Sequence, residues 1–303
     1  MPPSNSILPA SEWSPLIGFL RDFSLRADDL CYVPNNGNAG DALIASGAWQ
    51  LFDAIGLRPK IISATEVLEG ASVIYAGGGN LIPYYEDCAR FLRTCMSVGV
   101  KEAVILPHTI RGHVDLLQQL DERFMLVCRD QPSLEWCATN ARAARFMPSH
   151  DLALQLDVGN LQRRCRGLMP LATLLIRTSQ ARQLRSYLRW LRYAQSVQPV
   201  SGTLRVFRAD VEAVSHHPGD RTQDIPASYV SEYSNRVEHD FVARDLLDTI
   251  GRAENIVTNR LHVGIAGALL GKRVQLYDNS YGKIRDVYQS SLKDCGWVSY
   301  GGQ

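Results

Sequence analysis

Short apolar runs alternate with amphipathic helical segments along most of the chain. In the first half, the runs with the length and composition of buried strands are residues 30–33, 73–76, 103–106, 124–128 and 145–147. After Asp41, apolar residues recur at helical spacing until Gly56, a residue type that commonly ends helices. Because this alternation is typical of βα units around a parallel sheet, it predicts a Rossmann-like α/β domain over residues 1–155.

The alternation breaks over residues 156–170, which contain two glycines, a proline and three arginines, and we interpret this segment as an interdomain linker. Beyond it, the predicted strands are residues 173–176, 204–207, 255–257 and 274–277. The predicted helices are residues 180–194, 261–270, 283–292 and a segment that ends at Gly251. A second Rossmann-like domain is therefore predicted over residues 171–303.

Composition narrows the class of protein. With 303 residues, of which 46% are hydrophobic and 21% charged, the chain can form two domains that each bury a core. A formal net charge of +1 gives no protein-wide attraction for nucleic acid, so we expect no nucleic-acid partner. The composition therefore favours a folded protein that acts on smaller ligands.

Cysteine usage and hydropathy bear on location. The seven cysteines are odd in number, form no CxxC pair and mostly lie in apolar runs, which indicates reduced thiols rather than a disulfide framework or a metal site. The chain has neither a signal-peptide pattern at its start nor a run that approaches eighteen apolar residues. We therefore expect a cytoplasmic protein with no bound metal.

The first candidate site is the segment PNNGNAGD, residues 34–41, between a predicted strand and a predicted helix. Its glycines permit close backbone approach, and the free N–H groups of a helix start attract anions or hydroxyl groups. The segment lacks both the GxGxxG pattern and the lysine of a P-loop. Asn38, Gly40 and Asp41 are therefore candidate ligand contacts, and Asp41 either caps the helix or serves as a hydroxyl-binding or proton-accepting carboxylate.

A second glycine-rich segment, GGGN at residues 77–80, follows the predicted strand 73–76. Consecutive glycines are tolerated where a ligand or another part of the chain comes very near, although a tight structural turn is an alternative. Both glycine-rich segments follow strands of one predicted sheet, so they should leave it at the same carboxyl edge, where open α/β sheets bind ligands. Gly78, Gly79 and Asn80 are therefore candidate contacts.

Arg260 and His262 form the third candidate site, at the start of the helix that follows strand 255–257. An arginine fork binds a phosphate or a carboxylate, and the helix N-terminus favours the same anion. A histidine beside that anion can exchange a proton with a substrate, although the helix N-terminus disfavours imidazolium until the anion restores its proton affinity. A structural role for His262 is the alternative.

Charged residues alternate just past the predicted strand 204–207, at Arg208, Asp210 and Glu212. In an extended segment this spacing places all three side chains on one side. Such an arrangement suits an anion held by Arg208 and a sugar hydroxyl held by a carboxylate. A solvated, mutually neutralised loop is the alternative.

Seven segments together resemble, in order, the polysaccharide pyruvyl transferase family from about residue 30 to residue 290, with the middle third poorly matched. They are GNAGDALI (37–44), GGGNL (77–81), LPHTIRG (106–112), RDQPSLEW (129–136), FRADVEA (207–213), TNRLHVGIAGALLGK (258–272) and DNSYGK (278–283). The resemblance implies a GT-B-like enzyme, in which two Rossmann-like domains face each other across a central cleft. It also implies phosphoenolpyruvate as co-substrate, no bound cofactor and a pyruvate ketal on a sugar as product.

The resemblance also assigns residues. The family's Arg-Leu-His motif, which binds the donor and takes part in proton transfer, falls on Arg260, Leu261 and His262. The donor-linked arginine of an RxDxE-like stretch falls on Arg208. The C-terminal domain would then be the donor side and the N-terminal domain the acceptor side. One departure is His108, which stands where glutamine is expected and is either a second titrating group or a polar substitute at the acceptor side.

The working hypothesis is a pyruvyl transferase that acts on a sugar of an exopolysaccharide or of its lipid-linked precursor. His262 is its acid or base, and Asp41, Asp210 or Glu212 deprotonates the sugar hydroxyl. One alternative is a GT-B glycosyltransferase that uses a nucleotide sugar, because one fold serves both chemistries. Another is a non-catalytic carbohydrate-binding member of a polysaccharide assembly complex. The sequence does not indicate the oligomeric state.

Arginines recur at spacings of three, four and three in the predicted helix 180–194, at Arg182, Arg185, Arg189 and Arg192. This spacing places all four on one helix face. A solvated face is one interpretation. The other is peripheral contact with the anionic inner face of the cytoplasmic membrane, which would suit a lipid-linked acceptor.

Overall fold

The computed structural model describes residues 7–27, 29–165, 202–214, 224–228 and 235–302. The predicted strand 173–176 and the arginine-rich helix 180–194 lie outside the described residues. The chain divides into two compact units. Unit 1 comprises Met1–Ile7, Asn36–Gly47 and Leu156–Gln303, and unit 2 comprises Leu8–Asn35 and Ala48–Gln155.

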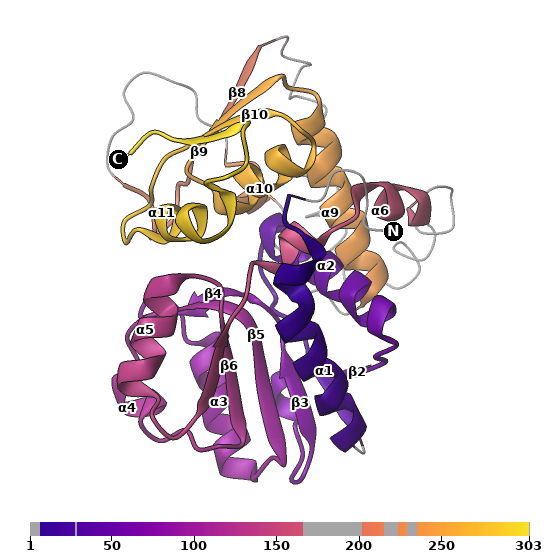
Figure 1. Ribbon diagram of the computed structural model, residues 1–303, viewed down its shortest axis with the longest axis vertical. Coiled ribbons are helices and arrows are strands. Elements are labelled where there is room, and N and C mark those ends of the chain that lie inside the picture. Colours follow the sequence, from indigo (N-terminus) through magenta and orange to yellow (C-terminus); the bar gives the residue numbers. More distant parts are fainter. Residues whose placement is uncertain (1–6, 28, 166–201, 215–223, 229–234, 303) are drawn as a thin grey trace. The chain divides into compact units, whose positions relative to one another are not determined.

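A parallel sheet forms the centre of unit 2 (Figure 1). Its strand order is β2-β1-β3-β5-β6-β7, and β4 pairs with β5 beyond this path. The strands are β1 (Leu30–Val33), β2 (Lys60–Ile61), β3 (Ser72–Tyr75), β4 (Gly78–Leu81), β5 (Glu102–Ile110), β6 (Phe124–Cys128) and β7 (Arg145–Pro148). Strands β3, β5 and β6 are buried along their whole length, which explains why they read as continuous apolar runs.

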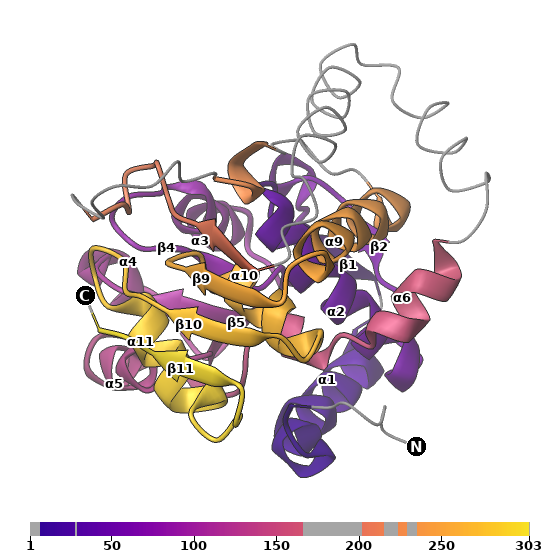
Figure 2. The same ribbon diagram turned by 90° about the horizontal axis from the view of Figure 1, so that it is seen from above.

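Helices cover both faces of this sheet: in Figure 1, α3 lies behind it and α1 in front, and Figure 2 shows the two on opposite sides. The helices that lie wholly in unit 2 are α1 (Ser14–Arg26), α3 (Asp87–Val98), α4 (Val114–Leu117) and α5 (Gln131–Asn140), and the 3₁₀ turns are Ala10–Trp13, Ala64–Glu66 and Leu152–Gln155. Helix α2 (Ala39–Ile55) has its first turns in unit 1 and the rest in unit 2.

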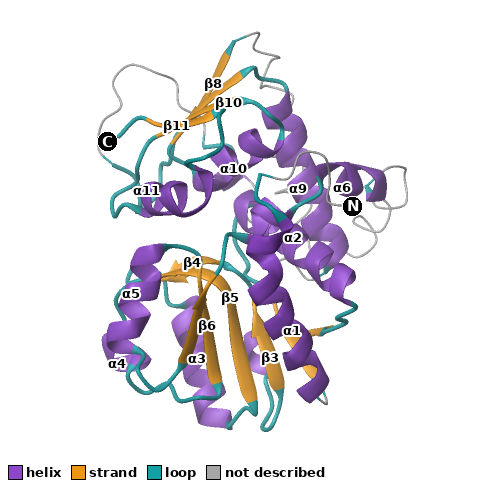
Figure 3. Cartoon of the chain, viewed as in Figure 1, coloured by secondary structure: helices purple, strands orange, loops and turns teal. Residues whose placement is uncertain are grey.

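Unit 1 contains a second parallel sheet with the strand order β11-β10-β9-β8. Its strands are β8 (Thr203–Val206), β9 (Asn255–Thr258), β10 (Arg273–Leu276) and β11 (Val298–Tyr300). Its helices are α6 (Val158–Arg164), α9 (Arg236–Gly251), α10 (Leu261–Leu269) and α11 (Lys283–Val287), followed by a π-helical turn at Tyr288–Leu292, and a 3₁₀ turn lies at Pro226–Ser228. In both units helices and strands alternate along the chain (Figure 3).

Helix α10 packs unusually close to its sheet. A Cβ atom on Gly264 would overlap the side chain of Leu276 on β10, and one on Gly267 would lie 2.8 Å from Val274 Cγ2. Glycine is unfavourable in a helix interior, so its presence here is explained by the close approach. The tight packing fixes the position of the α10 N-terminus.

The predicted α/β fold with parallel sheets is confirmed, and β1 and β6 have the predicted bounds. The facing of two domains across a cleft, and the predicted domain limits, stay predictions. One interpretation was wrong. Residues 78–80, which we expected to leave the sheet, belong to strand β4, because pairing with β5 supplies backbone hydrogen bonds that a glycine-rich sequence does not predict. Within the segment interpreted as a linker, residues 158–164 form helix α6, which Asp157 caps.

Candidate functional site

The turn from β9 to α10 positions two of the predicted residues. Arg260 is the N-cap residue of α10, with extended backbone angles, and His262 is the second residue of the helix. The hydroxyl of Thr258 donates to the carbonyl of Val206 at 2.6 Å and accepts the amide of Arg260 at 2.9 Å. One side chain thus ties the ends of β8 and β9 together and fixes the backbone at Arg260.

The guanidinium of Arg260 is buried, with 4% of the residue exposed. Its Nε donates to Oδ1 of Asp224 at 2.7 Å, and its Nη2 donates to Oδ2 of the same carboxylate. Nη2 also lies 3.0 Å from Oδ2 of Asp210. Arg260 therefore already holds one carboxylate in a bidentate pair and a second carboxylate at its edge.

Arg208 and Arg260 share one partner, the carboxylate of Asp210. Nε and Nη2 of Arg208 each lie 2.9 Å from an oxygen of Asp210, and Nη2 is also 2.9 Å from Oε1 of Glu212. The amide of Arg208 donates to Oδ1 of Asn259 at 2.7 Å. The three charged side chains of this segment thus pair with one another, in a turn at residues 210–212 rather than in an extended segment, and Asp210 Oδ2 contacts both guanidiniums.

The pKa of Asp210 follows from these contacts. Partial burial raises it, whereas the hydrogen bond from Arg208 and the positive charges of Arg208 and Arg260 lower it by more. The net result is a pKa below the usual value of a carboxyl group. Asp210 is therefore ionised at neutral pH and stabilises both guanidiniums.

Glu212 is held from its other side by the segment DNSYGK. Its Oε2 accepts from Lys283 Nζ at 2.6 Å and from Asn279 Nδ2 at 2.8 Å, and 2% of the residue is exposed. Sequence reasoning missed Lys283 and Asn279 as site residues, because no local spacing links them to residue 212. The resemblance of the segment to the family was the one signal that could have found them.

The first turn of α2 also belongs to this site in unit 1. A Cβ atom on Gly40 would lie 2.5 Å from Nδ1 of His262, so the imidazole packs directly against this backbone. Oδ1 of Asn38 accepts the amide of Gly40 at 2.8 Å, and Oδ2 of Asp41 accepts the amide of Asn38 at 2.9 Å. Asn38, the residue before the first residue of α2, therefore caps the helix, and the carboxylate of Asp41 accepts the backbone amide of Asn38 in return.

This arrangement corrects the interpretation of Asp41 as the cap, because the helix begins three residues earlier than that interpretation requires. It also changes the grouping of the predicted residues. The sequence placed Asn38, Gly40 and Asp41 on the acceptor side in the N-terminal domain, whereas the compact units group them with Arg260 and His262. Leu261, assigned by resemblance to donor binding, is the first residue of α10 and is 2% exposed.

The second glycine-rich segment belongs to a polar cluster of unit 2. His108 is fully buried on β5, and its Nε2 lies 3.1 Å from the amide nitrogen of Asn80 and 2.8 Å from its Oδ1. Nε2 accepts from the amide in one tautomer and donates to Oδ1 in the other. Asn80 Nδ2 donates to Asn35 Oδ1 at 2.9 Å and to the hydroxyl of Tyr75 at 3.1 Å.

The backbone of this segment is equally constrained. A Cβ atom on Gly78 would lie 2.7 Å from Asn35 Nδ2, while Gly79 is partly exposed between two buried neighbours. Strands β1 and β3 pair in parallel with Val33 opposite Tyr75, so the ends of the two strands lie at the same edge of the sheet. The ring of His108 orders Asn80, and a direct acceptor contact by His108 stays a prediction.

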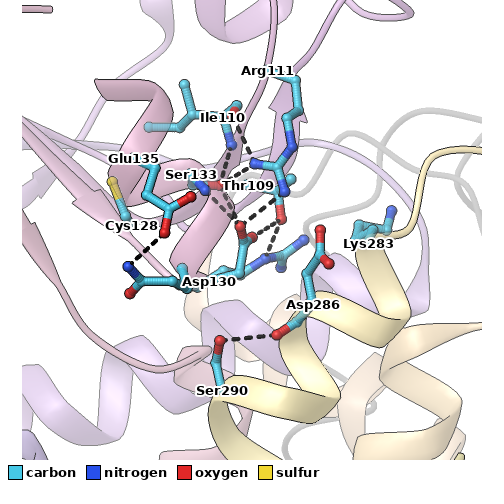
Figure 4. Close-up of polar contacts among 12 residues, drawn as sticks. Thr109, Ile110, Arg111, Cys128, Asp130, Ser133, Glu135, Lys283, Asp286 and Ser290 are labelled. Carbon is cyan, nitrogen blue, oxygen red and sulfur yellow. Dashed lines mark hydrogen bonds and ion pairs between the residues drawn. The ribbon is translucent and has the colours of Figure 1, made fainter. Parts of the chain in front are cut away.

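A further network at the carboxyl ends of β5 and β6 was not predicted (Figure 4). Asp130 caps α5: its Oδ1 accepts the amide of Ser133 at 2.9 Å, the hydroxyl of Ser133 at 2.7 Å and Nη2 of Arg111 at 3.0 Å. Its Oδ2 accepts the hydroxyl of Thr109 at 2.9 Å. The segments LPHTIRG and RDQPS, which carried part of the family resemblance, thus meet in one buried network.

Arg129 extends this network into the interior of unit 2. Its Nε donates to the hydroxyl of Thr109 at 2.9 Å, and its Nη1 lies 2.6 Å from Oδ2 of Asp151. The side chains of Arg129 and Asp151 are each 1% exposed. Sequence reasoning missed this pair because a buried arginine after a strand looks the same in sequence as a solvent-facing one.

These observations define a class: an α/β protein with parallel sheets that presents two neighbouring guanidiniums and an imidazole at the carboxyl ends of strands. The family model for polysaccharide pyruvyl transferase matches residues 38–281. This span covers most of the chain and includes every predicted site residue. The chain therefore belongs to the polysaccharide pyruvyl transferase family, whose members are transferases.

A solved structure agrees on the fold. A functionally uncharacterized protein from Klebsiella pneumoniae is similar to this chain with a TM-score of 0.73 and 24% sequence identity, over 96% of this chain and 99% of the other. This likeness concerns the fold alone. No curated protein matches the chain. Among the helices of the described residues, none has the length and apolar character needed to cross a membrane.

Proposed function

We propose that this protein transfers the pyruvyl group of phosphoenolpyruvate to a sugar of an exopolysaccharide or its lipid-linked precursor, forming a pyruvate ketal and releasing phosphate. The observation that carries the proposal is the contact of one oxygen of Asp210 with both Arg208 and Arg260, at 2.9 Å and 3.0 Å. Two guanidiniums on one oxygen are close enough to bind the two anionic ends of one three-carbon donor. His262 begins the adjacent helix.

The chemistry begins with a proton from His262 to the C3 methylene of the donor, which leaves an oxocarbenium-like centre at C2. A sugar hydroxyl attacks C2 and loses its proton to a base. The C2–O bond to phosphate then breaks, and phosphate leaves with the bonding electrons. A neighbouring hydroxyl attacks the resulting cation at C2 and gives its proton to the imidazole of His262, which closes the ketal. A bound anion beside the ring favours the protonated imidazole and thus supplies the acid that the first step needs.

Among the candidate bases, we favour Asp41. Asp210 accepts hydrogen bonds from Arg208, and Glu212 accepts them from Lys283 and Asn279. Hydrogen bonds from cationic groups stabilise the ionised carboxylate and weaken it as a base. Asp41 follows Gly40, whose backbone lies against the imidazole of His262, so the acid and the base would act from neighbouring positions.

A phosphate-release assay tests the proposal directly. Phosphoenolpyruvate is mixed with the protein and with β-galactosides, β-mannosides or β-glucosides, and UDP-glucose replaces it in a parallel set in which nucleotide release is measured. We expect phosphate release that requires both phosphoenolpyruvate and one class of acceptor. Nucleotide release, with no phosphate from phosphoenolpyruvate, would instead support the glycosyltransferase alternative. Sugar binding without turnover of either donor would support the carbohydrate-binding alternative.

A pair of variants links turnover to the site. Arg260→Lys keeps the charge but loses the bidentate fork, and we expect kcat/KM to fall on the order of 10²-fold. Arg252→Lys is the matched control, because Arg252 is exposed at the end of α9. Equal activity of the two variants would contradict a role for Arg260 in donor binding.

A lipid-linked acceptor would bring the protein to the inner face of the cytoplasmic membrane. The four arginines proposed for membrane contact lie outside the described residues, so this part of the proposal is tested by experiment alone. We expect co-sedimentation with anionic liposomes to decrease when Arg182, Arg185, Arg189 and Arg192 are changed to glutamine. Co-sedimentation that does not change would remove the membrane contact and leave the transferase activity untouched.

A further inference from the structure

Asp224 reaches the site from a separate part of the chain, thirty-six residues before Arg260. Its two oxygens face Nε and Nη2 of Arg260, and its Oδ2 also accepts the amide of Ala209 at 3.1 Å. Its side chain is 11% exposed. The geometry is that of a carboxylate bound side-on to a guanidinium fork, which is how arginine binds carboxylate ligands.

The guanidiniums of this cluster carry carboxylates before any ligand binds. Among the described residues, the contacts reported above join three cationic side chains to three carboxylates: Arg208, Arg260, Lys283, Asp210, Glu212 and Asp224. The oxygens of an added anion would be repelled by these carboxylates in a largely buried region. A ligand carboxylate therefore takes the fork of Arg260 only if the carboxylate that occupies the fork leaves it.

The three carboxylates differ in which donors they occupy. Asp210 contacts two guanidiniums, and Glu212 contacts a guanidinium and an ammonium group. Asp224 spans both Nε and Nη2 of Arg260, whereas Asp210 contacts Arg260 at Nη2. The departure of Asp224 therefore uncovers the fork of Arg260.

We infer that Asp224 is a placeholder for the carboxylate of the ligand: it occupies the fork of Arg260 in the empty protein and is displaced when a carboxylate-bearing anion binds. The inference rests on the proposed function for the identity of the donor, and it adds an orientation. Arg260 takes the planar carboxylate end, which matches the side-on pair with Asp224, and the tetrahedral phosphate end lies elsewhere in the site. Asp224 is then a specificity-determining residue, because a ligand without a carboxylate gains nothing by displacing it.

Binding without turnover tests the inference. Dissociation constants of phosphoenolpyruvate, pyruvate and inorganic phosphate are measured by calorimetry for the wild type, Asp224→Asn and Asp248→Asn. Asp248 is the matched control, a half-exposed carboxylate of α9 that lies 3.7 Å from Arg244. Without the competing charge, we expect Asp224→Asn to bind pyruvate and phosphoenolpyruvate about tenfold more tightly, which is about 1.4 kcal/mol. Its affinity for phosphate, and all affinities of Asp248→Asn, should stay as in the wild type.

Two results would overturn the inference. Unchanged or weaker binding of both carboxylates by Asp224→Asn would mean that Asp224 holds Arg260 in place for the ligand. An equal gain for inorganic phosphate would remove the assignment of Arg260 to the carboxylate end. The identity of the donor is tested separately. If Asp224→Asn binds pyruvate more tightly but the wild type releases no phosphate from phosphoenolpyruvate, Asp224 is a placeholder and phosphoenolpyruvate is not the donor.

A measurement on the wild type covers the case in which Asp224→Asn does not fold. Displacement of Asp224 removes the acceptor of the Ala209 amide, so hydrogen exchange at Ala209 should become faster when pyruvate binds. Inorganic phosphate should have no such effect. Slower or unchanged exchange at Ala209 with bound pyruvate would contradict the displacement.

Discussion

Arg260 in unit 1 and Arg129 in unit 2 occupy equivalent local positions, just after a parallel strand and just before a helix, and each is buried against an aspartate. Their surroundings differ. Arg129 and Asp151 are each 1% exposed, and the bridging Thr109 is fully buried. The partner shared by Arg260 and Arg208 is Asp210, whose side chain is 33% exposed.

The difference teaches how to separate a structural ion pair from a functional one. Burial of the guanidinium does not distinguish the two kinds of ion pair, because both arginines are buried. What differs is the exposure of the partner carboxylates: the side chains of Asp210 and Asp224 are 33% and 11% exposed, whereas that of Asp151 is 1% exposed. The sealed network of unit 2 stabilises the fold around α5, whereas the partly open cluster of unit 1 is the one that we propose binds an anion.

The largest effect is expected at the imidazole of the open cluster. A well-placed acid contributes about 10²–10⁴-fold to the rate, so His262→Ala should lower kcat by that factor without a loss of folded protein. Phosphate release and the melting temperature are measured together. His150→Ala is the control, because His150 lies in unit 2 against Glu12 and Trp13. Full activity of His262→Ala would show that the proton comes from another group.

The sealed network is tested by Arg129→Met. Removing one partner of a buried ion pair leaves Asp151 uncompensated, and we expect the free energy of unfolding to fall by about 3–5 kcal/mol. Arg123→Met is the control, since the pair of Arg123 with Asp121 is exposed and should be worth less than about 1 kcal/mol. Denaturant unfolding measures both. Similar losses in the two variants would contradict the distinction between sealed and exposed pairs.

The contact between α2 and His262 gives a smaller effect. Gly40→Ala places a Cβ atom 2.5 Å from Nδ1 of His262. The ring must shift, and we expect kcat/KM to fall about ten- to a hundredfold, because catalytic groups tolerate little displacement. Gly18→Ala is the control: a Cβ there meets nothing within 4 Å, and alanine should stabilise helix α1 by about 0.5–1 kcal/mol. If the kinetics of Gly40→Ala are unchanged, the contact of Gly40 with His262 does not contribute to catalysis.

The smallest effect concerns another sealed group, His239 on α9. Burial lowers its pKa from 6.5 to about 3, so it stays neutral in the folded protein while the unfolded chain takes up a proton below 6.5. Its contribution to stability is therefore complete above pH 6.5 and is lost as the pH falls, by about 1.4 kcal/mol per pH unit. Urea unfolding of wild type and His239→Gln between pH 7 and 5 measures this slope. Parallel curves would contradict the effect.

The features that could be predicted from the sequence depend on residues that are close together along the chain. Strands β1, β3, β5, β6, β7, β8, β9 and β10 followed from their apolar runs, whereas β2, β4 and β11 were not predicted. The positions of Arg260 and His262 followed from a strand that leads directly into a helix. The alternation of Arg208, Asp210 and Glu212 likewise needed no distant partner. Each of these predictions depends on residues that are neighbours in sequence.

The parts that were missed depend on distant contacts. Strand β4 exists because β5 offers it a partner, and Lys283 enters the site because the turn before α11 brings it to Glu212. Asp224 meets Arg260 across thirty-six residues. At the start of α2, both Asn38 and Asp41 are good capping residues, so composition alone could not say which one caps.

The two glycines of α10 also limit how this protein can change during evolution. Because a single methyl group at residue 264 would collide with Leu276, even alanine there would require α10 to repack against β10. We therefore expect new ligand preferences to arise through the loop side chains that surround the helix start. Within the cluster described here, residues 210 and 224 are the positions where natural variation should track a change of donor.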